Sequence, residues 1–378
     1  MAANRNRPMR VAINAVMIAP GGGLNGLLGY LNAWRELGTP IEFIAYAARP
    51  PVLEAIQRVR PNLRVEPFSV GAGAAMSFYR QQVSLGPLME RAGADVVWTT
   101  QQAVGRCRLP QLVHHRNLVR FLVKRHWERL GHLEIAEWVR DVAAFRALRT
   151  VASNVFISDF MRREAERLVP ESTPRNCVIY NGLSRTLLAS AEIEHPTWAG
   201  EPHLMAITSQ MPYKDNLTLL QTLAELIRRR RDVPWRVRIA GGGDWSLVES
   251  QAAELGISDR IDYLGYVSHE EMEPLLRRSV CMIFTSRLEG FGNPPIEAMA
   301  RRCPVVACNT TAMPEVIGDA GVLVDPGSVQ QFADAVERYY LDRSFRAATV
   351  RRGIERMKLF SWADSAERMY QLFEAISR

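Results

Sequence analysis

Two glutamates eight positions apart flank a glycine-bearing turn in the second half of the chain. Glu289 and Glu297 enclose the segment GFGNPPI, and no other pair of glutamates in the sequence has this spacing. Carboxylates accept hydrogen bonds from ribose and sugar hydroxyls, and the glycines between them let backbone N–H groups approach a ligand. The ordinary alternatives are a helix-capping acid at Glu297 and a solvated loop acid at Glu289. We expect instead that both acids bind a sugar nucleotide.

The local elements favour this placement. The expected strand VCMIFTS ends just before Glu289, and the expected helix PPIEAMARR carries Glu297 in its first turn. Asn293 is expected to be the N-cap, with Pro294 at the first helical position. Both acids then point toward one edge of a cleft, where the helix N-terminus also favours an anion.

A cation for the anionic part of such a ligand follows the first strand of this half. Lys214 lies in the segment TSQMPYKDN, near the carboxyl end of the expected strand LMAITS. Ligands of parallel α/β sheets bind at that edge, so we expect Lys214 to reach a leaving phosphate. A solvated loop lysine is the alternative.

A second candidate phosphate loop begins the chain. Gly21, Gly23 and Gly26 form G-x-G-x-x-G, the pattern of a nicotinamide-binding turn. However, four residues separate the expected strand from the glycines, and the next strand, IEFIAY, ends without the acid that binds ribose. We therefore expect an oxyanion at Gly22 and Gly23, close to the helix N-terminus, and not a dinucleotide.

Strands and helices alternate along both halves of the chain, which predicts two parallel sheets, each covered by helices. The expected domains are residues 1–185, a linker at 186–202, residues 203–355, and a C-terminal helix at 356–378 that packs back toward the first domain. A ligand is expected in a cleft between the two sheets.

Composition narrows the class of protein. The 378 residues are 47% hydrophobic and 23% charged, with a net charge of +7, and no apolar run approaches a membrane span. The N-terminus has no signal-peptide pattern, so we expect a cytoplasmic protein. Five scattered cysteines without a C-x-x-C pair, and the lack of a D-x-D motif, predict no metal. The net charge alone also admits nucleic-acid binding, but arginine is spread along the chain.

These motifs resemble the retaining glycosyltransferases of family 4. The hallmark E-x7-E is followed here by AMARRCPVVA, and RIAGGGDW, DRIDYLGYVSHEEMEPLL, MPEVIGDAGVLVDP and FSWADSAERMYQLF match in order. The resemblance covers about residues 203–375 and is looser in the first half. It implies the GT-B fold, an α/β class with two Rossmann-like domains facing a cleft, and a helical tail.

The resemblance also implies roles for the donor-side residues. Glu297 would bind the donor ribose and Glu289 the transferred sugar. The backbone at Gly290, Phe291 and Gly292 would meet sugar hydroxyls and phosphate.

The family usually sets an arginine and a lysine against the diphosphate. Lys214 matches the lysine, but Gln210 stands where the arginine is expected. Either another arginine supplies the charge, with Arg287 one candidate, or donor affinity is lower.

In the first half, the family carries a histidine after a central strand, facing the sugar. The segment LPQLVHHRN offers His114 and His115, which alternation places on opposite faces. We favour His115 as the catalytic candidate. His114, Arg116 and Asn117 are candidates on the acceptor side.

The expected function is transfer of a hexose-type sugar from a UDP-, GDP- or similar nucleotide sugar to a glycan, lipid-linked or small-molecule acceptor. The resemblance implies retention of anomeric configuration without a metal or other cofactor, as in polysaccharide or lipopolysaccharide biosynthesis. The leaving phosphate would take the acceptor's proton, so we assign no general base. The alternatives are a nicotinamide oxidoreductase and another GT-B enzyme such as a sugar-nucleotide epimerase.

Residues 116–129, RNLVRFLVKRHWER, mix cations with aromatic residues. An amphipathic helix here could lie on anionic lipid at the inner membrane face. An ordinary helix packing its apolar residues inward is the alternative.

Overall fold

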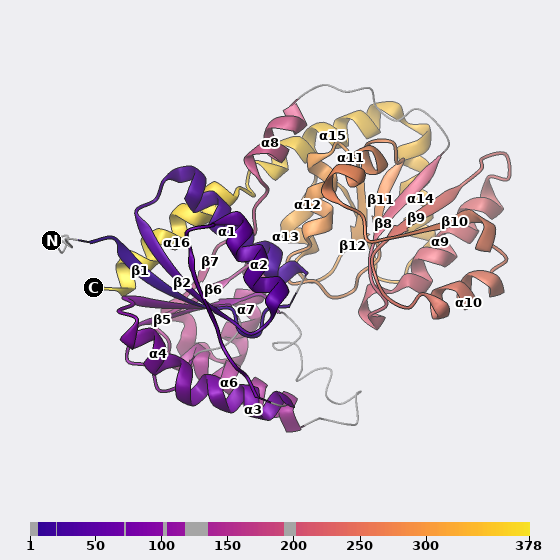
Figure 1. The fold of residues 1–378 in the computed structure, drawn as a ribbon. Helices are drawn as coiled ribbons and strands as arrows, with labels where there is room; N and C mark the ends of the chain where they lie inside the picture. Colours follow the sequence, from indigo (N-terminus) through magenta and orange to yellow (C-terminus); the bar gives the residue numbers. More distant parts are fainter. Residues whose placement is uncertain (1–6, 20, 72, 101–103, 118–134, 193–201) are drawn as a thin grey trace. The chain divides into compact units, whose positions relative to one another are not determined.

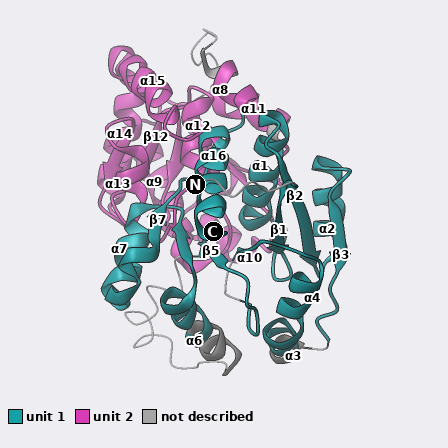
Figure 2. Cartoon of the chain, turned by 90° about the vertical axis from the view of Figure 1, so that its left-hand side faces the viewer, with its two compact units in different colours: residues 1–184, 362–378 teal, residues 185–361 magenta. Residues whose placement is uncertain are grey.

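The computed structural model describes residues 7–19, 21–71, 73–100, 104–117, 135–192 and 202–378. The chain divides into two compact units (Figures 1 and 2). Unit 1 contains residues 1–184 and 362–378, and unit 2 contains residues 185–361. Each unit is an α/β structure with its own parallel sheet, as the alternating pattern predicts.

The sheet of unit 1 has seven strands in the order β3-β2-β1-β4-β5-β6-β7, and all of its pairings are parallel. The strands are β1 (Met9–Asn14), β2 (Ile41–Ala47), β3 (Arg64–Pro67), β4 (Val96–Thr99), β5 (Gln111–His115), β6 (Ser153–Phe156) and β7 (Asn176–Val178). Its α-helices are α1 (Gly22–Leu37), α2 (Pro50–Val59), α3 (Gly73–Arg80), α4 (Gly86–Arg91), α6 (Ile135–Thr150), α7 (Asp159–Leu168) and α16 (Trp362–Ile376).

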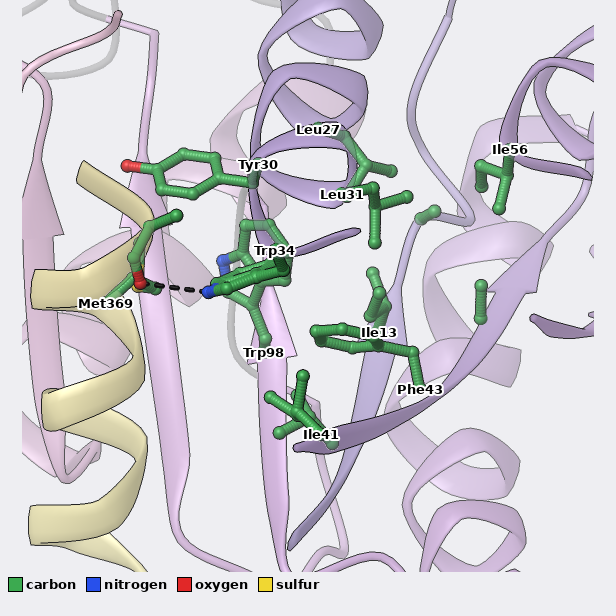
Figure 3. Packing of buried hydrophobic residues seen from close by; sticks show 14 of the residues in the cluster. Ile13, Leu27, Tyr30, Leu31, Trp34, Ile41, Phe43, Ile56, Trp98 and Met369 are labelled. Atoms are coloured by element: carbon green, nitrogen blue, oxygen red, sulfur yellow. Dashed lines mark hydrogen bonds between the residues drawn. The ribbon is translucent and has the colours of Figure 1, made fainter. Parts of the chain in front are cut away.

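An aromatic core holds α1 and α16 on this sheet (Figure 3). Trp34 on α1 is fully buried and packs on Phe43, Trp98 and Phe373. Its indole N–H donates to the carbonyl oxygen of Ala366 on α16 at 2.9 Å, which satisfies the ring's one polar atom. Helix α16 is therefore part of the core of unit 1, although it is the last helix in the sequence (Figure 2).

The sheet of unit 2 has six strands in the order β10-β9-β8-β11-β12-β13, again with parallel pairings. The strands are β8 (His203–Ile207), β9 (Arg236–Ala240), β10 (Ile261–Gly265), β11 (Cys281–Phe284), β12 (Val305–Cys308) and β13 (Val322–Val324). Its α-helices are α8 (Arg185–Glu192), α9 (Asn216–Arg229), α10 (Ser246–Glu254), α11 (His269–Arg277), α12 (Asn293–Ala300), α13 (Met313–Ile317), α14 (Val329–Leu341) and α15 (Arg343–Met357).

Two predicted segments fall partly outside the described residues. The expected linker, residues 186–202, begins inside α8, and residues 193–201 are not described. The expected amphipathic helix at 116–129 lies outside from residue 118 onward. Among the residues that are described, no helix has both the length and the apolar character that a membrane crossing requires.

Candidate functional site

An ion pair joins two of the predicted site residues in unit 2. Nζ of Lys214 lies 2.6 Å from Oε1 of Glu289, and both side chains are largely buried, with 17% and 14% of their surface exposed. Lys214 lies in the short 3₁₀ turn that follows β8, and Glu289 lies in the loop after β11. The two loops meet because β8 and β11 are neighbours in the sheet, so their carboxyl ends share one edge.

Hydrogen bonds to backbone carbonyl oxygens also hold the two loops together. The hydroxyl of Thr285 donates to the carbonyl oxygen of Lys214 at 2.9 Å, and the N–H of Arg287 donates to the carbonyl oxygen of Tyr213 at 2.8 Å. The ammonium group of Lys214 also lies 5.4 Å from the centre of the Phe284 ring. These contacts fix the position of a charge at the sheet edge, as a preorganised binding site requires.

The helix that carries Glu297 begins one residue earlier than the sequence predicts. Gly292, and not Asn293, is the N-cap of α12, with φ 95° and ψ 66°. The prediction was wrong because the chain turns through the left-handed region, which favours glycine, before Asn293. Helix α12 has no side-chain cap, and Glu297 is the fifth helical residue, too late for a capping box.

Glu297 shares a buried arginine with a second acid. Its Oε2 lies 3.8 Å from Nη1 of Arg301, whose side chain is only 3% exposed. Nε of Arg301 lies 3.0 Å from Oε2 of Glu273 on α11. The Glu297 side chain is itself 26% exposed, so part of it remains accessible to a ligand.

The turn between the glutamates presents backbone more than side chains. The Phe291 side chain is buried and packs edge-on against Phe360, with ring centres 5.4 Å apart. A Cβ at Gly292 would lie 2.4 Å from Cε of Met313, so there is no room for a side chain at this position. Gly290, between Glu289 and Phe291, is half-buried.

Gln210, which replaces the expected arginine, lies beside a glycine of the β9–α10 loop. A Cβ at Gly243 would lie 2.1 Å from Oε1 of Gln210. Nε2 of Gln210 is buried and has no hydrogen-bond partner among the described residues. An amide N–H donor is therefore available at this position, but no charge.

Arg287, the candidate substitute cation, already has a counter-charge. Its Nε lies 2.7 Å from Oδ2 of Asp215, and its side chain is 51% exposed. Asp215 in turn caps α9, accepting from the N–H and the hydroxyl of Thr218. Because Asp215 compensates its charge, Arg287 would offer a diphosphate less net positive charge than an arginine without a counter-charge.

One site residue was missed by the sequence reasoning. Thr311, which follows β12 with a φ of 52°, accepts a hydrogen bond at its Oγ1 from the N–H of Glu289 at 3.1 Å. Its signal was its place after the strand CPVVAC, at the same sheet edge. Thr311 thus positions the loop that carries the carboxylate.

In unit 1 the glycines of the first loop have separate roles. Gly21 is the N-cap of α1 with φ 127°, and a Cβ at Gly22 or Gly23 would contact nothing within 4 Å. At Gly26 a Cβ would lie 2.1–2.5 Å from guanidinium atoms of Arg116. The third glycine of the motif therefore accommodates an arginine, and β1 ends at Asn14, well before the loop. Neither feature fits a dinucleotide turn.

The two histidines contact different groups. Nε2 of His115 lies 3.0 Å from Oδ1 of Asn154, and the ring stacks on Phe156 with ring centres 4.7 Å apart. His114 lies edge-on to Tyr30, and neither of its ring nitrogens has a hydrogen-bond partner within the described part of the chain. Both histidines are buried, and burial holds the pKa of His114 well below its ordinary value.

Arg116 and Asn117, the other acceptor-side candidates, come directly after His115 in the sequence. Arg116 is half-buried, and its Nη2 donates to the carbonyl oxygen of Gly22 at 3.4 Å. Asn117 is exposed. No cluster of three or more His, Cys, Asp or Glu side chains suitable for a metal is found in the described ranges.

Comparison with known families identifies the second unit. Residues 190–356 match the family of glycosyl transferases group 1. Unit 2 is a group 1 glycosyl transferase domain. The expected family is thereby confirmed over the segment that carries Lys214, Glu289 and Glu297.

The curated relatives match this chain over only part of their own length. The O-antigen chain mannosyltransferase B of Escherichia coli is 39% identical over 118 residues, which are 31% of this chain and 30% of that protein. The chain spans less than half the length of the curated relatives compared.

Solved structures match nearly the whole chain. A glycosyltransferase from Rickettsia africae has a TM-score of 0.74 at 15% identity, covering 98% of this chain and 99% of its own. The Anabaena protein HepE, solved with UDP and glucose, has a TM-score of 0.73 at 17% identity, covering 96% and 98%. At these identities the likeness concerns the fold, and the predicted GT-B class with two Rossmann-like parallel sheets is confirmed.

Proposed function

We propose that the protein is a glycosyltransferase that moves a hexose-type sugar from a nucleotide sugar to a glycan, lipid-linked or small-molecule acceptor, with retention and without a metal. The observation that supports it most is the Lys214–Glu289 pair, which lies at the sheet edge of the unit that matches the group 1 glycosyl transferases. The E. coli mannosyltransferase and the HepE complex with UDP and glucose support a hexose and a nucleoside diphosphate.

Each residue has a role that its chemistry allows. The Glu297 carboxylate accepts hydrogen bonds from the ribose hydroxyls, and Glu289 accepts from hydroxyls of the transferred sugar. Lys214 and the amide of Gln210 donate to the diphosphate, while the positive end of the α12 dipole favours the same anion. The 2.6 Å ion pair balances the charge of Lys214 against that of Glu289.

In the reaction, the bond between the anomeric carbon and the diphosphate oxygen breaks, and a bond to the acceptor oxygen forms on the same face. The acceptor's proton passes to the leaving phosphate. The protein's part is to position both substrates and to stabilise the charge that develops on the phosphate, chiefly through Lys214. No single residue is assigned as general base, and a catalytic role of His115 stays a prediction.

A thermal-shift panel of UDP-, GDP-, ADP- and dTDP-sugars tests the donor site. The matching donor should stabilise the protein by about 2.7 kcal/mol at a hundredfold excess over Kd. Glu297→Gln should lose this shift. Glu273→Gln, which removes the other acid at Arg301, should keep it. A full shift in Glu297→Gln would remove Glu297 from the donor site.

Turnover separates transfer from the alternative of epimerisation. A transferase releases a nucleoside diphosphate for each sugar moved, whereas an epimerase returns the sugar still attached to the nucleotide. Release of free nucleoside diphosphate together with a glycosylated acceptor is the expected result, and an epimerised donor as the main product would contradict the proposal.

The cellular location is part of the same proposal. We infer catalysis at the cytoplasmic side, with a peripheral contact to the inner membrane through residues 116–129. Flotation with anionic liposomes tests this contact, and a protein that stays at the bottom of the gradient would exclude it.

A further inference from the structure

A cavity of about 930 Å³ lies at the amino-terminal edge of the unit 1 sheet, where β5, β6 and β7 begin. Its walls come from α3, from α6, from a π-helical turn at Gln81–Leu85 and from the loop at residues 104–110. Helices α3 and α6 contact each other here (Figure 1). His115 ends β5 at the opposite edge of the sheet, so this cavity is separate from the predicted sugar site. Its volume is within the range of small-molecule sites, roughly 300–1,000 Å³.

Four arginines line this cavity without a compensating acid. They are Arg106 and Arg108 in the loop, Arg146 on α6, and Arg175 just before β7. No Asp or Glu is among the lining residues whose side chains the structure describes, and no described carboxylate forms an ion pair with any of the four arginines. Glu90 accepts from the backbone N–H of Arg108 at 2.6 Å, and not from its guanidinium. The cavity therefore has a positive potential that favours an anion.

The same cavity has an apolar wall. Val104, Ala147 and Val151 are buried, with at most 4% of their surface exposed, and Phe78 and Leu109 are half-buried. A small inorganic anion would leave this wall in contact with water, whereas a ligand with an apolar body would remove it from water. Guanidinium groups beside an apolar wall therefore favour an organic anion over an inorganic one.

The loop that carries two of the arginines is held in place by the fold. The side chain of Gln111 accepts from the N–H of Val104 at 2.8 Å and donates to its carbonyl oxygen at 2.9 Å. Arg106 has a φ of 42°, which few residues other than glycine adopt. A Cβ at Gly105 would lie 2.3 Å from the carbonyl oxygen of Gln82 in the π-helical turn, so the two segments pack closely. These contacts preorganise the cationic wall, which lowers the cost of ordering it around a ligand.

We propose that this cavity binds an organic anion with an apolar body, such as an amphipathic carboxylate, sulfonate or phosphate ester, at a site separate from sugar transfer. The anionic group lies among the four arginines, because guanidinium groups form bidentate hydrogen bonds with such oxyanions. The apolar body lies against the wall formed by α3, α6 and the start of β5. The inference goes beyond the proposed function, which depends on Lys214, Glu289 and Glu297 in unit 2.

The test titrates the full chain with anilinonaphthalene sulfonate, an aromatic sulfonate that fluoresces strongly in apolar surroundings. The wild type should show saturable binding. Arg106→Gln and Arg146→Gln should each weaken it about tenfold, since a charge-assisted hydrogen bond is lost. Ala143→Phe should also weaken it, because it fills the cavity from α6 without changing the charge. Arg58→Gln removes an exposed arginine on α2 outside the cavity and should bind as the wild type does.

Three results would overturn the inference. The first is a wild type without saturable binding, and the second is binding that stays unchanged in Arg106→Gln, Arg146→Gln and Ala143→Phe. The third is binding that saturating nucleoside diphosphate abolishes, since the probe would then lie in the donor site. The melting temperature of each variant, measured without the probe, shows that it is folded. None of these results affects the proposed function, because the donor-induced thermal shift depends on Glu297.

Discussion

At the scale of single residues, Lys214 is the group on which the chemistry most depends. The chain has three lysines, and of the two that the structure describes only Lys214 lies at the carboxyl edge of the unit 2 sheet. Its partner Glu289 reaches it across 75 positions of sequence. The pair combines a donor for phosphate with an acceptor for hydroxyls, which is what a sugar phosphate presents.

Lys214→Ala should lower the turnover number by about 10²–10³-fold, because it removes a preorganised donor to the leaving phosphate and leaves Glu289 without its cation. The measurement is the rate of nucleoside diphosphate release. Lys358→Ala is the matched control, since Lys358 is exposed and pairs only with Glu355 of its own helix among the ion pairs of the described residues. Turnover within threefold of wild type in Lys214→Ala would be inconsistent with its role.

His114 predicts a pH dependence of stability at the same scale. Its folded-state pKa lies well below the unfolded value of 6.5, chiefly because burial disfavours the charged form. The unfolded chain therefore binds a proton first as the pH falls. Stability is fully present above pH 6.5 and decreases below it, by about 1.4 kcal/mol per pH unit for this group.

Chemical denaturation at pH 7.5 and pH 5.5 measures this loss. His114→Phe keeps an aromatic ring in the Tyr30 and Trp98 cluster and removes the titrating group. We expect a smaller loss between the two pH values in the variant. An equal loss would show that other groups account for the acid sensitivity.

At the scale of elements, the turn into α12 decides how Glu297 is presented. Two effects disfavour a side chain at position 292. The positive φ would strain any residue other than glycine, and a Cβ would collide with Met313. Helix α12 therefore depends on glycine for its starting point and for the direction of its first N–H groups.

Gly292→Ala should destabilise unit 2 by about 2–4 kcal/mol, from left-handed strain plus overpacking. Gly256→Ala is the control, because Gly256 has a φ of 67° but a Cβ there would meet nothing within 4 Å. Gly256→Ala should lower the free energy of unfolding only by the backbone strain, about 1 kcal/mol. Equal costs in urea denaturation would show that the Met313 contact relaxes freely.

At the scale of the whole molecule, the chain leaves unit 1 at residue 184 and returns to it at residue 362. The returning helix α16 is no peripheral tail, because Ala366, Met369 and Phe373 are buried in the core shared with Trp34. Each unit has its own core, so a defect in one core should leave the other intact.

Phe373→Ala should cost unit 1 about 3–5 kcal/mol, the usual result of emptying a buried aromatic site. Scanning calorimetry should show the unit 1 transition at lower temperature and the unit 2 transition, identified by its shift with donor, unchanged. Gln371→Ala, an exposed position on the same helix, is the control. A parallel fall of both transitions would show that the two cores unfold as one.

The sequence by itself determined the fold class and the family of the second unit. Alternating strands and helices depend on local hydrophobic periodicity, and E-x7-E with its glycines lies within one loop and one helix turn, so both can be recognised along the chain. The start of α12 was misplaced by one residue because Asn293 and Gly292 are both competent caps, and the left-handed backbone angle of Gly292 that decides between them is not visible in the sequence.

Only the tertiary structure decided which residues meet. Strand order brings Lys214 to Glu289 and Thr311, and it pairs Arg287 with Asp215, none of which follows from spacing. The glycine motif of the first loop could be counted in the sequence, but the partner that requires Gly26 is Arg116, 90 positions away in the chain. Contacts between distant segments depend on how the sheets order their strands, and local sequence preferences restrict that order without fixing it.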